Sequence, residues 1–259
     1  DGGTNIFVVP VVANNNGASG LELSANSASG DVEVAAISFI ANSNTSYGLD
    51  ANLKAYSNIT VVLGDLNGLI PIPVTNIAGS GQMIGNGLGG LRLAATSFVG
   101  SVTAAVGNVT ANNNAGPGAA ADISLTAAQD VTASLFDSEV NGNTSAFGLR
   151  LRHIAGSNAF VTLENVEASN NDGANFAQPL AEAGGTSLLV VRNVTVTNNG
   201  GVGLVAHATS AGSATVLVES VVANDNFQGV DLYARASAGA ALVSISNMVA
   251  NNNTTIGVE

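Results

Sequence analysis

The sequence predicts an all-β fold, a parallel β-helix of about nine coils with three short strands in each coil. Three observations predict it. A pattern recurs about every 28 residues, apolar residues alternate with other residues inside each repeat, and one position of the repeat is always asparagine. Short alternating segments that return at a fixed period, without a helical pattern between them, are typical of a solenoid of strands.

The asparagine position sets the register of the repeat. It recurs at spacings of 28, 42, 28, 29, 28, 28, 27 and 27 residues. Equivalent residues on neighbouring coils lie about 4.8 Å apart, and an asparagine amide both donates and accepts a hydrogen bond. We therefore predict a continuous asparagine ladder along the rod, formed by Asn16, Asn44, Asn86, Asn114, Asn143, Asn171, Asn199, Asn226 and Asn253.

Two corners are expected to separate the three strands of each coil. The first lies six residues before the ladder position and the second two residues before it, where residues such as Asn108 and Asn112 can hydrogen-bond the local backbone. Alternating pairs such as Val216 and Val218 precede this corner, and pairs such as Leu149 and Leu151 follow the ladder position. This period of two predicts strands with one apolar face each.

The composition excludes several classes of protein. The apolar content is 46% but the aromatic content only 4%, which suits a narrow core of Val, Leu, Ile and Ala in a single domain over residues 1–259. The absence of cysteine excludes disulfides and cysteine nucleophiles. A formal charge of −12 disfavours nucleic acid, and no apolar run reaches membrane-spanning length. We expect no cofactor and no membrane insertion.

The spacing of 42 residues equals one repeat plus 14 residues, and the extra residues fall within ITVVLGDLNGLIPIPVTN, residues 59–76. Asn67 and Gly68 stand between two strand-like runs, which is a strong hairpin signal. The sequence therefore predicts an inserted hairpin or loop at about 63–76. It serves either as a binding arm or as a tolerated surface insertion.

Glu139 and Glu167 are the candidate catalytic pair if the protein is an enzyme. They are expected to point outward on adjacent coils, with backbones about 5 Å apart, and retaining glycosidases use a pair of carboxylates. The charges nearby also fit a purely structural role. Glu164, Arg192 and Glu219 fall in one column with alternating sign, which favours a solvated ladder of ion pairs.

A second candidate site contains Arg150, Arg152 and His153, which follow one glycine corner. Asp122 is expected beside Arg152 on the neighbouring coil. Such an arginine could act as a base or could hold a sugar carboxylate in a lyase. The competing interpretation is an ordinary surface salt bridge.

The remaining polar residues give weaker signals. The two histidines fall at distant register positions, so we expect no shared metal site, and His207 is expected to stack on Tyr233 one coil further on. Several Asn-Xaa-Ser/Thr sequences match the glycosylation pattern, but most fall in the ladder or corner columns. Only Asn58 is expected to lie outside these columns.

Stretches such as VVRNVTVTNNGGVGLVA and VSISNMVANNNTTIGV resemble the parallel β-helix repeat of the pectate-lyase-like superfamily. The resemblance covers about residues 6–259, and it implies a right-handed helix. That superfamily includes lyases, glycoside hydrolases, phage tailspikes, adhesins and structural surface proteins. Its lyases usually carry a dense calcium-binding acidic cluster, which the sequence does not assemble around the arginines.

The terminal repeats carry no polar cap, and the sequence stops partway through its ninth coil. We expect either continuation into a longer chain or head-to-tail self-association. The leading hypothesis is a non-catalytic extracellular or cell-surface structural protein, either an adhesin stalk or a filament subunit. The alternatives are a secreted polysaccharide lyase or glycoside hydrolase, and a carbohydrate-binding spike, so that carbohydrate is the ligand in both.

Overall fold

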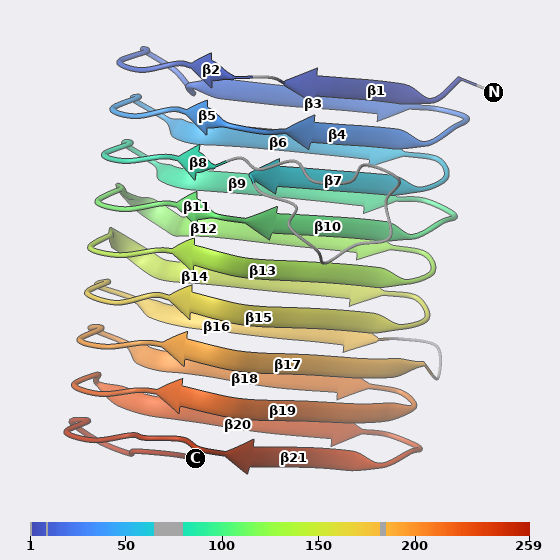
Figure 1. Ribbon diagram of the computed structural model, residues 1–259. Coiled ribbons are helices and arrows are strands. Elements are labelled where there is room, and N and C mark those ends of the chain that lie inside the picture. The colour runs from blue at the N-terminus through green and yellow to red at the C-terminus, as the bar shows by residue number, and fades with distance from the viewer. Residues whose placement is uncertain (1, 9, 65–79, 182–184) are drawn as a thin grey trace.

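A computed structural model describes residues 2–8, 10–64, 80–181 and 185–259. Within these residues all helices are absent, and the paired strands are parallel throughout. The chain winds into a parallel β-solenoid of about eight turns, with the first and last turns at opposite ends of a rod (Figure 1). The predicted all-β solenoid is confirmed.

The strands form two sheets that face each other across the core. The first strands of the successive turns build most of a 13-stranded sheet: β1 (Thr4–Val8), β4 (Val32–Ala36), β7 (Ile59–Gly64), β10 (Val102–Gly107), β13 (Val131–Glu139), β15 (Ala159–Glu167), β17 (Thr186–Thr195), β19 (Ser213–Val222) and β21 (Ala241–Ser246). Short second strands complete it: β2 (Val11–Val12), β5 (Phe39–Ile40), β8 (Gly81–Gln82) and β11 (Val109–Thr110). The opposite sheet has eight strands: β3 (Leu21–Ser27), β6 (Tyr47–Ala55), β9 (Gly89–Ser97), β12 (Ala115–Ala127), β14 (Thr144–Ala155), β16 (Ala174–Ala181), β18 (Val202–Ser210) and β20 (Gln228–Ala236).

The prediction of three strands in every coil holds only for the first four turns. In the next four turns, β13, β15, β17 and β19, the first and second strands merge into one longer strand that continues through the first corner. One residue with positive φ, such as Asp137 in β13, bends the strand there without ending it. The pairing of β13 with β15 resumes directly after this bend, at Ser138 and Glu139. In the last turn β21 ends before the corner, and Val249 pairs with Val222 in an isolated bridge.

Both predicted corners consist of residues in the left-handed backbone region, where Asn and Asp are tolerated better than other residues with a Cβ atom. The first corner has φ between 48° and 60° at Ser38, Asn108, Asp137, Asn165, Asn193, Ser220 and Asn247. The second corner takes this conformation directly before the ladder position, at Asn15, Ser43, Gly85, Asn113, Gly142, Asn170, Asn198, Asp225 and Asn252.

The predicted asparagine ladder is confirmed along the whole rod. Each ladder residue from Asn16 to Asn226 donates its backbone N–H to the side-chain Oδ1 of the next, at 2.8–3.1 Å. Some Nδ2 groups donate to the same oxygen, and others donate to a backbone carbonyl, as Asn171 does to Val140 at 2.8 Å. Six of the nine side chains, those of Asn44, Asn86, Asn114, Asn143, Asn171 and Asn226, are at least 98% buried. Because these amides are buried, they need the hydrogen-bond partners that the ladder provides.

A single narrow core of Val, Leu, Ala and Ile runs the length of the rod. Inward residues stack on like residues, as Leu21, Leu49 and Leu91 do in the eight-stranded sheet. The predicted insertion falls mainly on residues outside the described part of the chain. Of its predicted range, Leu63 and Gly64 are the last residues of β7, and the described chain resumes at Ser80 just before β8. The described residues include no helix long and apolar enough to span a membrane.

Candidate functional sites

His153 lies inside the rod, which corrects the sequence-based grouping of this residue with Arg150 and Arg152. Leu151, His153 and Ala155 alternate with the two arginines along β14, so the histidine shares the inward face. The period of two that predicted the strands assigns His153 to this face. The grouping followed proximity along the chain and overlooked this alternation.

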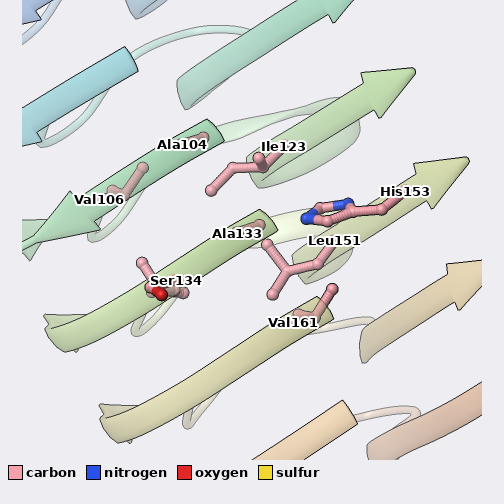
Figure 2. Close-up of a pocket in the computed structure, with 9 residues that line it drawn as sticks. Ala104, Val106, Ile123, Ala133, Ser134, Leu151, His153 and Val161 are labelled. Carbon is pink, nitrogen blue, oxygen red and sulfur yellow. The ribbon is translucent and has the colours of Figure 1, made fainter. Parts of the chain in front are cut away.

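The His153 side chain is fully buried and lines a small cavity between the two sheets (Figure 2). Its walls are mainly apolar side chains: Ala104, Val106, Ile123, Ala133, Leu135, Leu151 and Val161. Neither ring nitrogen has a hydrogen-bond partner. Burial lowers the pKa of His153 to about 4, and the backbone of Arg152 opposes this effect only in part. The imidazole is therefore neutral at pH 7.

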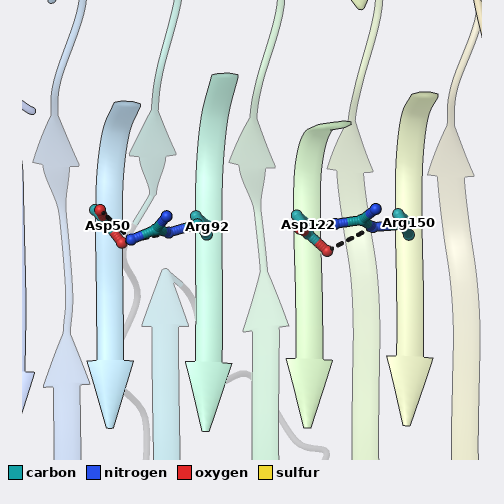
Figure 3. Close-up of polar contacts among 4 residues, drawn as sticks. All are labelled: Asp50, Arg92, Asp122 and Arg150. Carbon is teal, nitrogen blue, oxygen red and sulfur yellow. Dashed lines mark hydrogen bonds and ion pairs between the residues drawn. The ribbon is translucent and has the colours of Figure 1, made fainter. Parts of the chain in front are cut away.

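Four charged residues form a column on the outer face of the eight-stranded sheet (Figure 3). Arg92 donates two hydrogen bonds of 2.8 Å to Asp50, from Nε to Oδ1 and from Nη2 to Oδ2. Arg150 holds Asp122 in the same two-pronged way, with Nε 3.0 Å from Oδ1. This hydrogen bonding to Asp122 raises the pKa of Arg150 against the opposing effect of partial burial.

Asp122 was expected beside Arg152, and this expectation is wrong. The register pairs Asp122 with Arg150 and places Arg152 opposite Ser124. An error of two residues in aligning neighbouring strands keeps every side chain on the correct face, so alternation alone could not reveal it. Arg152 is exposed on the outer surface.

An aromatic ring lies against each of the two paired arginines. The Arg92 guanidinium carbon is 4.9 Å from the centre of the Tyr47 ring, and that of Arg150 is 5.7 Å from the Phe147 ring. Each unit thus contains an acid on one turn, an arginine on the next, and a ring beneath the arginine. Cation–π contact adds to the ion pair and fixes the plane of the guanidinium.

Glu139 and Glu167 stack on adjacent turns as predicted, and both are exposed. Asn112 donates from Nδ2 to Glu139 at 3.4 Å, and the next residues along the column are Thr110 and Thr195. The described part of the chain holds no group of three His, Asp or Glu residues suited to a metal ion. The stacked pair therefore consists of two solvated carboxylates with hydroxyl and amide neighbours. Neither carboxylate lies in an apolar environment.

The remaining predicted contacts are confirmed in their register. Glu164, Arg192 and Glu219 form the expected column, with Arg192 Nε 3.4 Å from Glu219 Oε2. Both side chains of this pair are about half exposed, so the ion pair contributes little to stability. His207 packs edge-on against Tyr233, with ring centres 5.4 Å apart, as expected.

Two further polar ladders escaped the sequence analysis. One lies directly before the first strand of each turn, where successive backbone N–H groups donate to the preceding side chain at 2.8–3.3 Å through Asp31, Asn58, Ser101, Asp130, Asn158 and Thr186. Asn58, expected outside all ladders, belongs to this one. The mixture of Asp, Asn, Ser and Thr hid the column, although all four accept a hydrogen bond from the backbone.

The other ladder lies two residues before the main asparagine ladder. Its backbone N–H groups donate to side-chain oxygens of the preceding turn at 2.7–3.1 Å, as from Asn141 to Asn112 and from Ser169 to Asn141. The sequence had marked this column only as a corner. Its bonds run in the direction opposite to those of the main ladder.

Comparison with known proteins identifies no relative: no family model matches the chain, nor does any curated protein or solved structure. The assignment of a parallel β-solenoid therefore rests on the strand register and the ladders of this chain. Function has to be inferred from how the side chains are used.

Proposed function

We propose that the chain is a non-catalytic, extracellular structural rod of the pectate-lyase-like kind, which serves as a surface stalk or a filament element. One observation carries the proposal. Among the residues that the structure describes, many polar side chains are used in ladders that join each turn to the next, and they do not converge on a point where a substrate could react. An active site needs convergent groups with matched protonation states.

Two features of the ladders support a role as a spacer. They lie at both ends of the flattened turn, so each turn is held to the next at opposite edges. Their bonds repeat with the same geometry along the rod. The distance from a backbone N to the next Oδ1 is 3.0 Å both at Asn16 and at Asn199. A rod built in this way keeps its length and can be extended by adding turns.

The last turn supports axial association, the second part of the proposal. The inward residues Val243 and Ile245 are 37% and 46% exposed, whereas their counterparts one turn earlier, Val216 and Val218, are at most 2% exposed. At the other end, Asn16 donates to Asn44, and no earlier turn of the described chain donates to Asn16. We propose that further turns, from a longer chain or from a second copy, stack on these ends and continue the ladder.

A screen for turnover tests the non-catalytic part of the proposal. The protein should release no product from pectate, alginate or neutral glucans. Activity that disappears in Glu139→Gln or Glu167→Gln, while the far-ultraviolet circular dichroism stays unchanged, would overturn the structural rod in favour of a secreted lyase or hydrolase. Arg192→Ala is the control, because it removes an exposed charge from the same sheet.

The two arginine–aromatic units favour one second candidate, a carbohydrate-binding rod. Planar polar groups beside an aromatic ring can contact the hydroxyls and the face of a sugar. If this function holds, Tyr47→Ala should weaken retention on an acidic polysaccharide column, while Tyr56→Ala, an exposed tyrosine outside both units, should not. Equal retention of both variants and the parent protein would exclude these units as the binding site.

A further inference from the structure

The column that contains His153 is otherwise apolar in the neighbouring turns. The register places His153 beside Leu125 of β12, and Leu53 and Ala95 occupy the same column in earlier turns. A polar ring is thus inserted where the rod elsewhere carries aliphatic side chains. It lacks a hydrogen-bond partner at either nitrogen, which is unusual for a fully buried polar group.

No described ionisable side chain faces His153 from the strands packed against it. The side chains that line its cavity from β10, β12, β13 and β15 are all uncharged. The charged neighbours on β14 itself, Arg150 and Arg152, lie on the outer face and carry the same sign as an imidazolium. A proton on His153 would therefore be buried without a counter-charge while this turn stays closed.

The backbone pairing is interrupted at the same level of the rod. His153 pairs with Pro179 of β16, and proline has no N–H to donate. The pairing of β16 with β18 skips Gln178 and Pro179, whereas β18 and β20 pair continuously from Leu204 to Ser210. The β14–β16 register also shifts between Phe147 and Arg150. The strand that pairs with β14 at His153 is therefore itself held to the next turn by fewer paired residues than β18 is.

We propose that the seam between β14 and β16 is an acid-sensitive opening point of the rod, with protonation of His153 as the trigger. The buried imidazole is accommodated only in its neutral form, and water reaches it when the strands separate. Acid therefore favours the open turn. This inference is independent of the proposed structural role, because it concerns the stability of one seam whatever the rod does.

The sign follows from the lowered pKa of His153. In the closed seam the pKa of the His153 imidazole is about 4, whereas the pKa of the exposed imidazole has its ordinary value of 6.5. Above pH 6.5 both states are neutral and the closed seam keeps its full stability. As the pH falls from 6.5 toward 4, the open state takes up the proton first and stability is lost. Between pH 7 and pH 5 the opening equilibrium should rise by about 20-fold.

Hydrogen exchange at pH 7 and pH 5, corrected for the intrinsic pH dependence, tests the proposal on the full chain. Peptides covering β14 should lose protection by about 20-fold at pH 5 relative to peptides covering β6. His153→Leu should abolish this difference, and it should fold because Leu125 occupies the same column. His153→Met provides a second apolar replacement. His207→Leu is the matched control, because it removes the histidine of the outer surface.

Three outcomes would overturn the proposal. They are equal protection of β14 at both pH values, an acid effect that persists in both His153 variants, and an acid effect that His207→Leu removes. Retained protection at pH 5 in the His153 variants, together with loss in the parent and in His207→Leu, supports it.

Discussion

At the scale of single residues, asparagine does two different jobs in this protein. In the ladder column a buried side chain accepts the backbone N–H of the preceding turn, as Asn171 does from Asn143 at 3.1 Å. At the corners, asparagine adopts a positive φ that most residues avoid, as at Asn193. Together with the two further ladders, these two requirements explain why asparagine is abundant in the sequence.

Asn171→Ala should destabilise the rod by about 1–3 kcal/mol, because it leaves the Asn143 N–H and the Val140 carbonyl unpaired in a buried site. Asn224→Ala is the control, since it removes a similar side-chain acceptor near the surface, where water can replace it. Chemical denaturation measures both. A loss for Asn171→Ala no greater than that for Asn224→Ala would contradict a buried ladder.

The corner prediction separates conformation from hydrogen bonding. Asn193 has φ of 50° and is exposed, with its Nδ2 donating to Asn165 at 3.1 Å. Asn193→Val should cost about 1–2 kcal/mol because a β-branched residue resists this backbone region. Asn193→Gly should change stability much less, because glycine enters the region freely. Thermal unfolding that ranks the two variants in the opposite order would contradict the conformational explanation.

The residue types that alternate or repeat strictly were predictable from the sequence. All nine ladder positions were assigned correctly because one residue type fills the column. Asn58 was missed because its column mixes four residue types. His153 was misplaced because chain proximity to two arginines was given more weight than the inward position it shares with Leu151.

At the scale of the turn, a column of glycines makes room for the ladder. A Cβ atom on Gly20, Gly148 or Gly203 would lie 2.5–2.6 Å from the Nδ2 of a ladder asparagine on the next turn. The strand after the second corner therefore carries glycine at this position in these turns, whereas Ala120 stands there in β12. In β16, the turn after Gly148, Asn175 is buried at this level of the turn. Its side-chain Oδ1 accepts the backbone N–H of Leu149, and its Nδ2 donates to the carbonyls of Ala168 and Gly203.

Gly148→Ala should lower the melting temperature by several degrees, because its methyl group would press on the amides of both Asn171 and Asn175. Gly17→Ala provides the control. It has no atom within 4 Å of the added carbon, so the variant should match the parent or gain about 0.4–1 kcal/mol. Similar melting temperatures for the two variants would show that the glycine column is not a packing requirement.

The repeat length predicted several stacked pairs, and alternation predicted the face on which a side chain lies. Neither could fix the register of neighbouring strands where it shifts by two residues. The stacking of Glu139 on Glu167 and of His207 on Tyr233 followed from the repeat length alone. The partner of Asp122 did not, because both Arg150 and Arg152 lie on the correct face and only the register distinguishes them. The merging of first and second strands in β13, β15, β17 and β19 also has no period-two signal.

At the scale of the whole molecule, the rod combines a uniform interior with two unlike ends. The core cluster continues from the partly buried Ile6 and Val8 at one end to Met248 and Ala250 at the other. Each ladder has a direction. Within the described residues, one end of the ladder presents an unused side-chain acceptor, and the other end an unused backbone donor. The proposed head-to-tail stacking would continue both the core and the ladders. The net charge of −12 disfavours association through the sides.

The central claim, a structural rod that extends along its axis, is tested most directly by sedimentation velocity over a range of protein concentrations. The parent protein should form elongated species whose mass increases with concentration. Val243→Glu places a charge on the inward side of the last turn and should leave single rods, whereas Ser244→Glu adds the same charge on the outer side and should assemble like the parent. A parent protein that remains a single species at every concentration, or two variants that behave alike, would contradict extension of the rod by stacking of copies.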